Sequence, residues 1–455
     1  MKKIQKLALS FMMGGLALCF ASCGSDDDTT FDLPNVGQAT TTINSSDLAM
    51  QKTTKAYVEN VVYPTYQALA KNSRELYTAC TTLYKAAEAG TMTQSQIDAA
   101  CEAFKNARRE WERSEAFLYG SASDNNIDPH IDSWPLDHDE LVSALTNASL
   151  IAGFKSDTPE KFVSDKNEQF QSVLGFHGME FVLFREGQNR TVDAFKANET
   201  EEGMTSVKGI DELAFLAAVA GDVKNMTAML EFTWMGDAAS NDTKQVLQDN
   251  SYVFSSMRYN GFAAKGTMCY GQYLLTPAQT TGYQSWPGTI NQIFVGGCSN
   301  ICNEVQEQKL GQAWRVCNNQ GGTTEDGEAE SRDYIESPYS HRSFVDYKDN
   351  LYSIKNTLYG TRDIDAASPA ANSIMSLLSS LNYPDLSKLQ NALTAALKSL
   401  DDATAAQGYF LADPGSVAVK NAIDKIKDLD DELNAAGTWI RTPECKVTQE
   451  LTKHQ

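Results

Sequence analysis

His177 and Glu180 stand three residues apart in a segment with helical periodicity. At this spacing both side chains project from the same face of a helix. Such a pair can bind one metal ion, or can hold a proton donor beside a proton acceptor. The alternative is a satisfied buried pair without an ion. Because a chain with five histidines produces this spacing by chance, the pair alone is weak evidence.

Arg108 and Glu115 place two charges on the apolar face of another predicted helix. That face also carries apolar side chains at spacings of three and four, namely Ile97, Phe104, Trp111 and Leu118. An unpaired buried charge is strongly unfavourable. The two charged side chains therefore either lie at the rim of the face or belong to a polar site inside a helical bundle.

A loop punctuated by prolines follows and concentrates two histidines and four carboxylates within residues 127–139. They are Asp128, His130, Asp132, Asp137, His138 and Asp139. Oxygen and imidazole donors together suit iron, zinc or manganese. The alternative is a structural loop that caps the bundle.

Helices must position these side chains, and most of the chain has helical periodicity. The pattern predicts a first helix over 47–88 with a kink at Pro64. A capping box at Thr93 and Gln96 opens the second helix. Further helices are predicted at 168–184, at 338–358 with Ser337 as cap and Pro338 at the first position, and at 367–381, 385–407 and 416–436. Strand alternation is nearly absent, so the fold class is all-α, built as helical bundles.

Four segments are predicted along the chain. They are a lipoprotein signal peptide at 1–22, a flexible acidic tether at 23–45, an N-terminal helical-bundle domain at 46–240 and a C-terminal helical-bundle domain at 241–450. The C-terminal domain contains a glycine-rich stretch, in which Gly282–Gly297 and Gln320–Glu330 are predicted to be long loops.

The first residues have the pattern of a secretion signal. Lysines precede the apolar stretch Leu7–Ala21, and small residues lead to Cys23 as in a lipobox. A diacylated Cys23 would anchor the chain to a membrane, and the aspartates after it resemble surface-export signals. We therefore expect an outer-membrane lipoprotein, at the cell surface or on the periplasmic face. An ordinary cleaved signal peptide is the alternative.

The cysteines fit an oxidising compartment. Cys80 and Cys101 are equidistant from a break at Ala89–Thr91, so two antiparallel helices would bring them to one level. A disulfide is predicted between them. For Cys298, Cys302 and Cys317 a bridge plus one thiol is favoured over thiolate metal ligation, because zinc sites use tighter cysteine pairs.

The chain is strongly acidic, with a formal net charge of −21 over 455 residues. Such a field repels the phosphate backbone, so no nucleic-acid partner is expected. It would also concentrate cations near the protein. No run of 18 apolar residues occurs, so no transmembrane helix is expected.

Several motifs together resemble the imelysin family. They are Trp111-x-x-Ser114-Glu115-Ala116-Phe117-Leu118-Tyr119-Gly120, the segment Ile127-Asp128 to Trp134-Pro135-Leu136-Asp137, the Gly175-x-His177-x-x-Glu180 motif, and Glu336-Ser337-Pro338-Tyr339-Ser340. Their order and separation fit, and the resemblance covers about residues 50–430. It implies an extracytoplasmic protein with two helical-bundle domains and a site around Gly-x-His-x-x-Glu.

The resemblance leaves the activity open. The family takes its name from an insulin-cleaving membrane peptidase, whereas many relatives are iron-regulated and implied in iron or haem uptake. His177 would bind a metal ion, with Glu115 as a further ligand and Glu180 as ligand or general base. Supporting roles fall to Arg108, Asp132, Trp134, Asp137 and Ser337. Glu115, His177 and Glu180 are expected to converge on one pocket.

Three functions follow from these residues. A metallopeptidase is disfavoured, because the chain has no His-Glu-x-x-His motif to supply its zinc ligands. A protein that binds iron, zinc or haem for iron acquisition, with an outer-membrane uptake partner, is favoured by the hard oxygen donors. An interaction module, with His177 and Glu180 as a satisfied structural pair, is the third interpretation.

Overall fold

A long helical stretch opens the described part of the chain, at α1 (Ser45–Tyr57) and α2 (Tyr63–Glu88). The pattern correctly predicts this stretch and its interruption at Pro64. Proline lacks an N–H, and its ring collides with the carbonyl one turn earlier in a regular helix. A π-helical turn, η1 (Val58–Val62), widens the backbone just before Pro64, which then occupies the first turn of α2.

The computed structural model describes residues 45–250, 269–277, 283–324 and 327–442, apart from the side chain of Glu168. All of them fall in one compact unit that begins at Asn44. The predicted division near residue 240 stays a prediction. The predicted signal peptide, Cys23 and nearly all of the predicted tether lie outside the described residues.

Further helices and one pair of short strands follow α2 up to residue 250. They are α3 (Gln94–Glu112), η2 (Glu115–Phe117), α4 (Ser121–Asp124), α5 (Asp128–Ile131), α6 (His138–Thr146), α7 (Ala148–Phe154), α8 (Pro159–Phe170), η3 (Gln171–Val173), α9 (Gly175–Leu183), β1 (Phe184–Arg185), β2 (Gln188–Asn189), α10 (Val192–Lys196), α11 (Gly209–Met235), η4 (Gly236–Ala238) and α12 (Asn241–Asp249).

The elements after residue 268 complete the described part. They are α14 (Tyr270–Leu274), α15 (Trp286–Asn291), η5 (Gln292–Ser299), α16 (Asn300–Asn303), η6 (Glu304–Lys309), α17 (Gly311–Cys317), α18 (Ser343–Tyr359), α19 (Ile374–Ser380), α20 (Leu386–Gln407), η7 (Phe410–Ala412) and α21 (Val417–Trp439). The all-α prediction is confirmed, because the named strands among the described residues are β1 and β2, which form one short hairpin.

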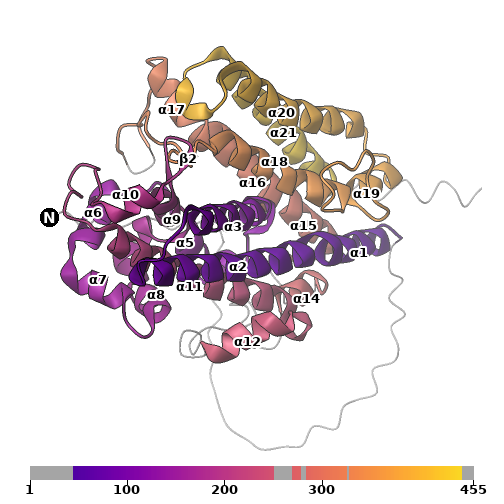
Figure 1. Cartoon of the computed structure of the whole chain (residues 1–455). Coiled ribbons are helices and arrows are strands. Elements are labelled where there is room, and N and C mark those ends of the chain that lie inside the picture. The colour runs from indigo at the N-terminus through magenta and orange to yellow at the C-terminus, as the bar shows by residue number, and fades with distance from the viewer. Residues whose placement is uncertain (1–44, 251–268, 278–282, 325–326, 443–455) are drawn as a thin grey trace, which may run out of the picture. The chain divides into compact units, whose positions relative to one another are not determined.

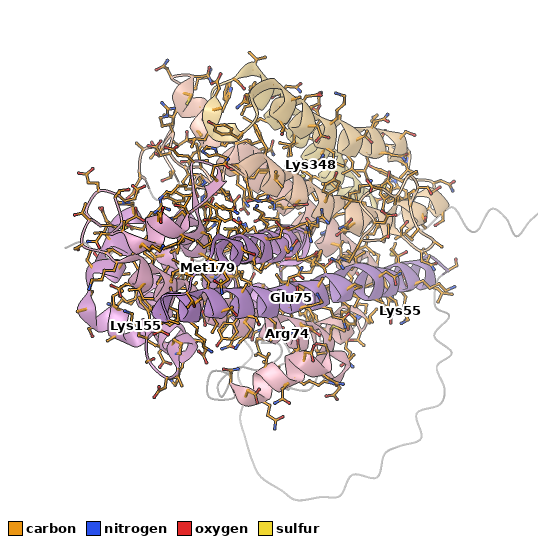
Figure 2. All side chains as sticks on the ribbon, viewed as in Figure 1. Lys55, Arg74, Glu75, Lys155, Met179 and Lys348 are labelled. Atoms are coloured by element: carbon orange, nitrogen blue, oxygen red, sulfur yellow. The ribbon has the colours of Figure 1, made fainter. Side chains whose placement is uncertain are left out.

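Three helix contacts organise the packing. α2 packs against both α3 and α11, and α20 packs against α21. α18 contacts α3 on one side and α20 on the other, so it joins the N-terminal helices to the C-terminal pair (Figure 1). Side chains fill the space between the ribbons, and the labelled Lys155 lies near the edge of the molecule in this view (Figure 2).

α11 is a long helix that lies largely in the interior. By length and apolar composition Gly209–Ala238 could cross a membrane, but 94% of its most apolar window is buried inside the protein. Its hydrophobicity on all sides is that of a core helix. It is the one such helix among the described residues.

The predicted helix at 168–184 is wrong in its interior. α8 ends at Phe170, Leu174 is extended, and α9 begins at Gly175, whose φ is +66°. A Cβ at Gly175 would lie 2.1 Å from the carbonyl oxygen of Ile131. Glycine is therefore required both for the turn and for the contact with α5. Because α9 begins at this break, the break determines the direction in which the His177 side chain points.

Three other predictions of local structure are also corrected. Ser337 does not cap a helix: its φ is +54°, and α18 begins at Ser343. The stretch 282–297 is not a long loop, because Ser285 caps α15 by accepting a hydrogen bond from the Gly288 amide, 3.1 Å away. The helix predicted at 367–381 is shorter and spans α19, whereas 320–330 contains no helix among its described residues.

The predicted disulfide between Cys80 and Cys101 is not formed. Both are buried free thiols on the packed helices α2 and α3, and the Cys101 Sγ donates to the Leu183 carbonyl at 3.7 Å. Burial raises the pKa of Cys80 well above its usual range, which keeps it a thiol. Cys298, Cys302 and Cys317 are free as well, so the predicted bridge among them is also wrong.

Candidate metal centre

Arg108 on α3 is the hub of the buried charges. Its side chain is only 1% exposed, so the interpretation that it lies at the rim of the helix is wrong. The guanidinium pairs with carboxylates from four places in the chain, which are Glu112, Asp132, Glu336 and Asp346. Helix α3, the end of α5 and the region around the start of α18 therefore converge on one group of charges.

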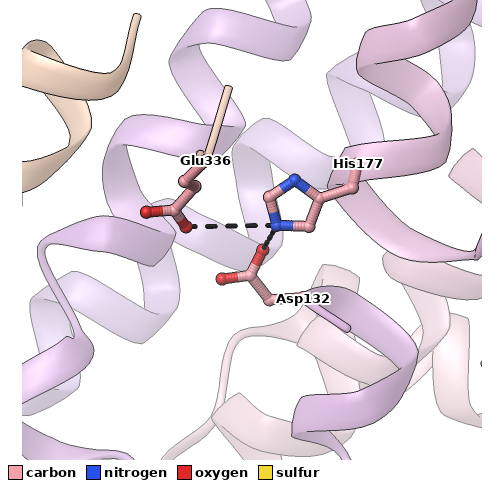
Figure 3. Close-up of side chains that lie close together, drawn as sticks. All are labelled: Asp132, His177 and Glu336. Carbon is pink, nitrogen blue, oxygen red and sulfur yellow. Dashed lines mark ion pairs between the residues drawn. The ribbon is translucent and has the colours of Figure 1, made fainter. Parts of the chain in front are cut away.

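Three side chains around this hub have the geometry of a metal site (Figure 3). His177 Nε2 lies 2.9 Å from Asp132 Oδ1 and 4.0 Å from Glu336 Oε1. One ligand atom from each of Asp132, His177 and Glu336 lies within 4.8 Å of the other two. The side chains are 7%, 3% and 1% exposed, respectively. Two carboxylates and one imidazole thus meet in the interior.

The imidazole of His177 faces the carboxylate of Asp132 through its Nε2 atom. Although Nε2 is close to Asp132, it makes no well-aligned hydrogen bond within the described structure. A buried polar atom without a hydrogen bond is costly and calls for an explanation. An imidazole nitrogen beside two carboxylate oxygens is a donor set that transition-metal ions accept. The donors present therefore fit such an ion.

A second group of carboxylates adjoins the first. Glu112, Glu115 and Asp132 each place an oxygen within 4.8 Å of the other two, so Asp132 belongs to both groups. Helix α3 ends at Glu112, and Glu115 starts the separate 3-10 turn η2. A Cβ at Gly297 would lie 2.2 Å from the Ala116 carbonyl oxygen, so that glycine lets η5 pack directly on this turn.

A buried lysine completes the centre. Lys309 is 2% exposed and lies at the end of η6. Its Nζ is 3.2 Å from Glu336 Oε2, 3.5 Å from Glu304 Oε1 and 3.4 Å from the amide oxygen of Asn350. Glu336 is therefore shared by Arg108, Lys309 and the group around His177.

The carboxylates of the centre outnumber its internal cations, and their pKa values reflect this. Burial raises the pKa of Glu115 and Glu112 well above the usual range, against the opposing effects of Lys309 and Arg108. Burial and neighbouring carboxylates raise the pKa of Asp128 to about 7. The pKa of Asp132 is lowered well below its usual range, because Arg108 and His177 outweigh its burial.

Glu180, predicted as a ligand or general base, contacts the segment before α18. One of its oxygens accepts a hydrogen bond from the backbone amide of Ser340, at 2.7 Å. Burial raises the pKa of Glu180, and Ser340 and His177 oppose this effect. Neither ligand group includes Glu180. It therefore ties α9, which carries His177, to the segment before α18.

The other predicted residues support local structure. Asp137 caps α6 by accepting from the Glu140 amide at 2.9 Å. Ser337 donates to Asp346, and the Trp134 ring lies 3.9 Å from that of Tyr334. Neither ligand group includes either loop histidine, His130 or His138. His130 Nδ1 lies 2.8 Å from Asp222 Oδ2 on α11, which fixes the segment that leads to Asp132.

Five contributors to the centre were not predicted from the sequence: Glu112, Glu304, Lys309, Glu336 and Asp346. Glu336 begins the Glu-Ser-Pro-Tyr-Ser motif and could have been selected on that ground. Lys309 lies in a π-helical turn next to Gly311, where periodicity cannot assign a buried face. Asp346 is on the buried face of α18. That face can be assigned from the sequence only when the first residue of the helix is known.

The fold and the site define an all-α protein with a buried histidine–carboxylate centre. The chain belongs to the imelysin family, because the sequence model described as Imelysin matches residues 62–436. A relative, Iron-regulated protein A of Synechococcus elongatus, is 25% identical over 181 residues, which cover 40% of this chain and 39% of the relative. The match thus spans about two fifths of the relative's length.

Two solved structures have the same fold. One is described as an iron-regulated protein A precursor from Parabacteroides distasonis, with a TM-score of 0.62 and 22% identity, covering 88% of this chain and 96% of that one. The other is an imelysin-like protein from Psychrobacter arcticum, with a TM-score of 0.51 and 13% identity, covering 85% and 93%. At these identities the likeness concerns the fold alone.

Proposed function

We propose that this chain binds an iron ion at the centre formed by Asp132, His177 and Glu336, and that it serves iron acquisition in the cell envelope. Glu112 and Glu115 would provide further oxygen donors beside it. The single observation behind the proposal is that two carboxylates and one imidazole, all three largely buried, place their ligand atoms within 4.8 Å of one another.

Charge supports the same conclusion. Glu112, Glu115, Asp132, Glu304, Glu336 and Asp346 surround two internal cations, Arg108 and Lys309. Buried carboxylates in excess cost free energy unless they are protonated or paired. A bound cation would pair them. The cost is then explained as the preparation of a binding site.

Iron is favoured over zinc by two considerations. One imidazole with several carboxylates is a hard, oxygen-rich donor set, which suits iron. Iron-regulated protein A of Synechococcus elongatus carries iron regulation in its name. Zinc remains the test ion for the alternative.

Haem and peptide cleavage fit the geometry less well. A porphyrin needs an apolar slot beside its axial ligand, whereas His177 is surrounded by Arg108, Asp132 and Glu336. A metallopeptidase must bring an extended peptide to its metal ion, and the three candidate ligands are at most 7% exposed. Metal binding is therefore preferred to both.

The location in the cell is proposed from the sequence and the family. We propose an outer-membrane lipoprotein anchored through Cys23, facing the cell surface and supplying an outer-membrane uptake partner. Replacement Cys23→Ala should abolish metabolic labelling with a fatty acid and shift the protein from the membrane to the soluble fraction. Unchanged membrane fractionation would contradict the anchor.

The metal proposal is tested by stoichiometry. The chain from Gly24 onwards, purified without a histidine tag or chelator, should bind one equivalent of Fe²⁺ per chain in anaerobic titration. His177→Ala and Glu336→Gln should each lower the affinity by roughly 100-fold or more. His138→Ala, a histidine outside both ligand groups, is the matched control and should bind as the native chain does. Equal binding by all four proteins would overturn the proposal.

A further inference from the structure

We propose that the Lys309 ammonium is a tethered cation that competes for the centre, and that a metal ion takes Glu336 only when Lys309 withdraws towards Glu304. This inference rests on the proposed metal binding and adds a residue that controls it. It makes Lys309 a determinant of affinity, distinct from the side chains that would hold the ion.

The contacts of Lys309 are those of a cation among oxygen donors. Its Nζ lies 3.2 and 3.4 Å from the two oxygens of Glu336 and 3.4 Å from the Asn350 amide oxygen. Glu336 is also one of the three candidate metal ligands. One carboxylate cannot give its full charge to both a lysine and a metal ion, so the two cations compete.

Lys309 has a second acidic partner, Glu304, which is more exposed than Glu336. Lys309 Nζ is 3.5 Å from Glu304 Oε1, and the Glu304 side chain is 32% exposed, compared with 1% for Glu336. Lys309 can therefore give up Glu336 and keep an ion pair while it moves outwards. The withdrawn position is partly hydrated, which lowers the cost of the move.

The backbone around Lys309 is held while the side chain is free to change partner. The Tyr347 hydroxyl donates to the Lys309 carbonyl at 3.2 Å. A Cβ at Gly311 would lie 2.4 Å from the Gln306 carbonyl oxygen, so the chain packs closely just after η6. A lysine has a flexible four-carbon stem and a single charged nitrogen, so it can move without displacing this backbone.

Arg108 is the contrasting cation. Its guanidinium is planar and engages Glu112, Asp132, Glu336 and Asp346 at once. To leave, it would have to break all of these pairs from a side chain that is 1% exposed. Of the two internal cations, Lys309 is therefore the one that can yield its place.

The first test compares two neutralised cations in the full chain. Lys309→Met should tighten the binding of Fe²⁺ and of Zn²⁺ by about tenfold or more, measured by competition with a chromophoric chelator. Arg113→Met removes a nearby charge that pairs with Asp349 and does not touch Glu336, and should tighten binding by less than about twofold. An equal gain in metal affinity in both variants would mean that Lys309 acts only through its general charge, and it would overturn the proposal.

A second test uses the native chain, so it does not depend on the folding of the Lys309→Met variant. Reductive methylation of the native chain, read by mass spectrometry at Lys309, should be blocked without metal and should proceed after loading with Zn²⁺. Continued protection in the loaded protein would overturn the proposal while leaving metal binding intact. If the native chain binds neither ion, or if His177→Ala binds as well as the native chain, the proposed function fails and this inference fails with it.

Discussion

The C-terminal helices α20 and α21 and the buried centre use charge in opposite ways. On α21, Lys427 and Asp431 form an ion pair one turn apart, with side chains 55% and 65% exposed. At the centre, Arg108 is 1% exposed and meets Glu336, 228 residues further along the chain. The first arrangement is local and hydrated, whereas the second is distant in sequence and dry.

The difference bears on how much each kind of charge contributes to the stability of the fold. Exposed pairs contribute little to stability, because water screens them and side-chain order costs entropy. A buried network seldom stabilises a fold more than apolar side chains of the same volume would. The centre is therefore best explained by a ligand, and the predictions below test that contrast.

The largest effect is expected at Arg108. Arg108→Met leaves the carboxylates of Glu112, Asp132 and Glu336 without their main cation, so it should lower the free energy of unfolding by about 3–5 kcal/mol. Urea denaturation of the metal-free protein measures this. Added Zn²⁺ should restore part of the loss, because a ligand that binds the folded state stabilises it. A loss below about 1 kcal/mol would show that the network is dispensable.

Substitutions of two glycines, one beside the centre and one after α20, provide a second comparison. Gly175→Ala meets both a φ of +66° and the Ile131 carbonyl, so it should cost roughly 2–4 kcal/mol and weaken metal binding by moving His177. Gly408→Ala, after α20, has a φ of +83° and open space around it. It should cost about 1 kcal/mol and leave metal binding unchanged. Thermal unfolding and metal titration compare the two.

The pH dependence should reveal the surplus of carboxylates. The pKa of Asp128 rises from an ordinary 3.8 to about 7 on folding. Between these values the folded state holds a proton that the unfolded chain has lost, so stability falls as the pH rises. We expect metal-free protein to lose about 2–3 kcal/mol between pH 5 and pH 8, and Asp128→Asn to lose less. Urea midpoints that stay level for the native chain would contradict this.

The helices were predictable where their causes are local. The capping box at Thr93 and Gln96 forms, and α20 and α21 match the ranges that periodicity predicts. The break at Gly175 was not predicted, because it depends on a contact with the Ile131 backbone. The cap at Ser285 was missed because the surrounding glycines suggested a loop, although they serve close packing.

The centre was predictable only in part, for a similar reason. Arg108 and His177 stood out because a charged or titratable side chain on an apolar face needs a partner. Glu180 was expected at the metal from its spacing, but its carboxylate points to the Ser340 amide. Lys309 and Glu336 belong to segments without regular periodicity, so only the tertiary structure brings them to His177.

The smallest effect is expected on the surface of α21, where two neighbouring aspartates provide an internal comparison. Asp431 pairs only with exposed Lys427 in the described structure, so Asp431→Asn should change the free energy of unfolding by less than about 0.5 kcal/mol. Asp430 is buried and accepts from Ser299 and Gln306, which tie α21 to η5 and η6. Asp430→Asn should therefore cost about 1–2 kcal/mol. Equal costs, measured by urea denaturation, would mean that burial does not separate the two kinds of charge in this protein.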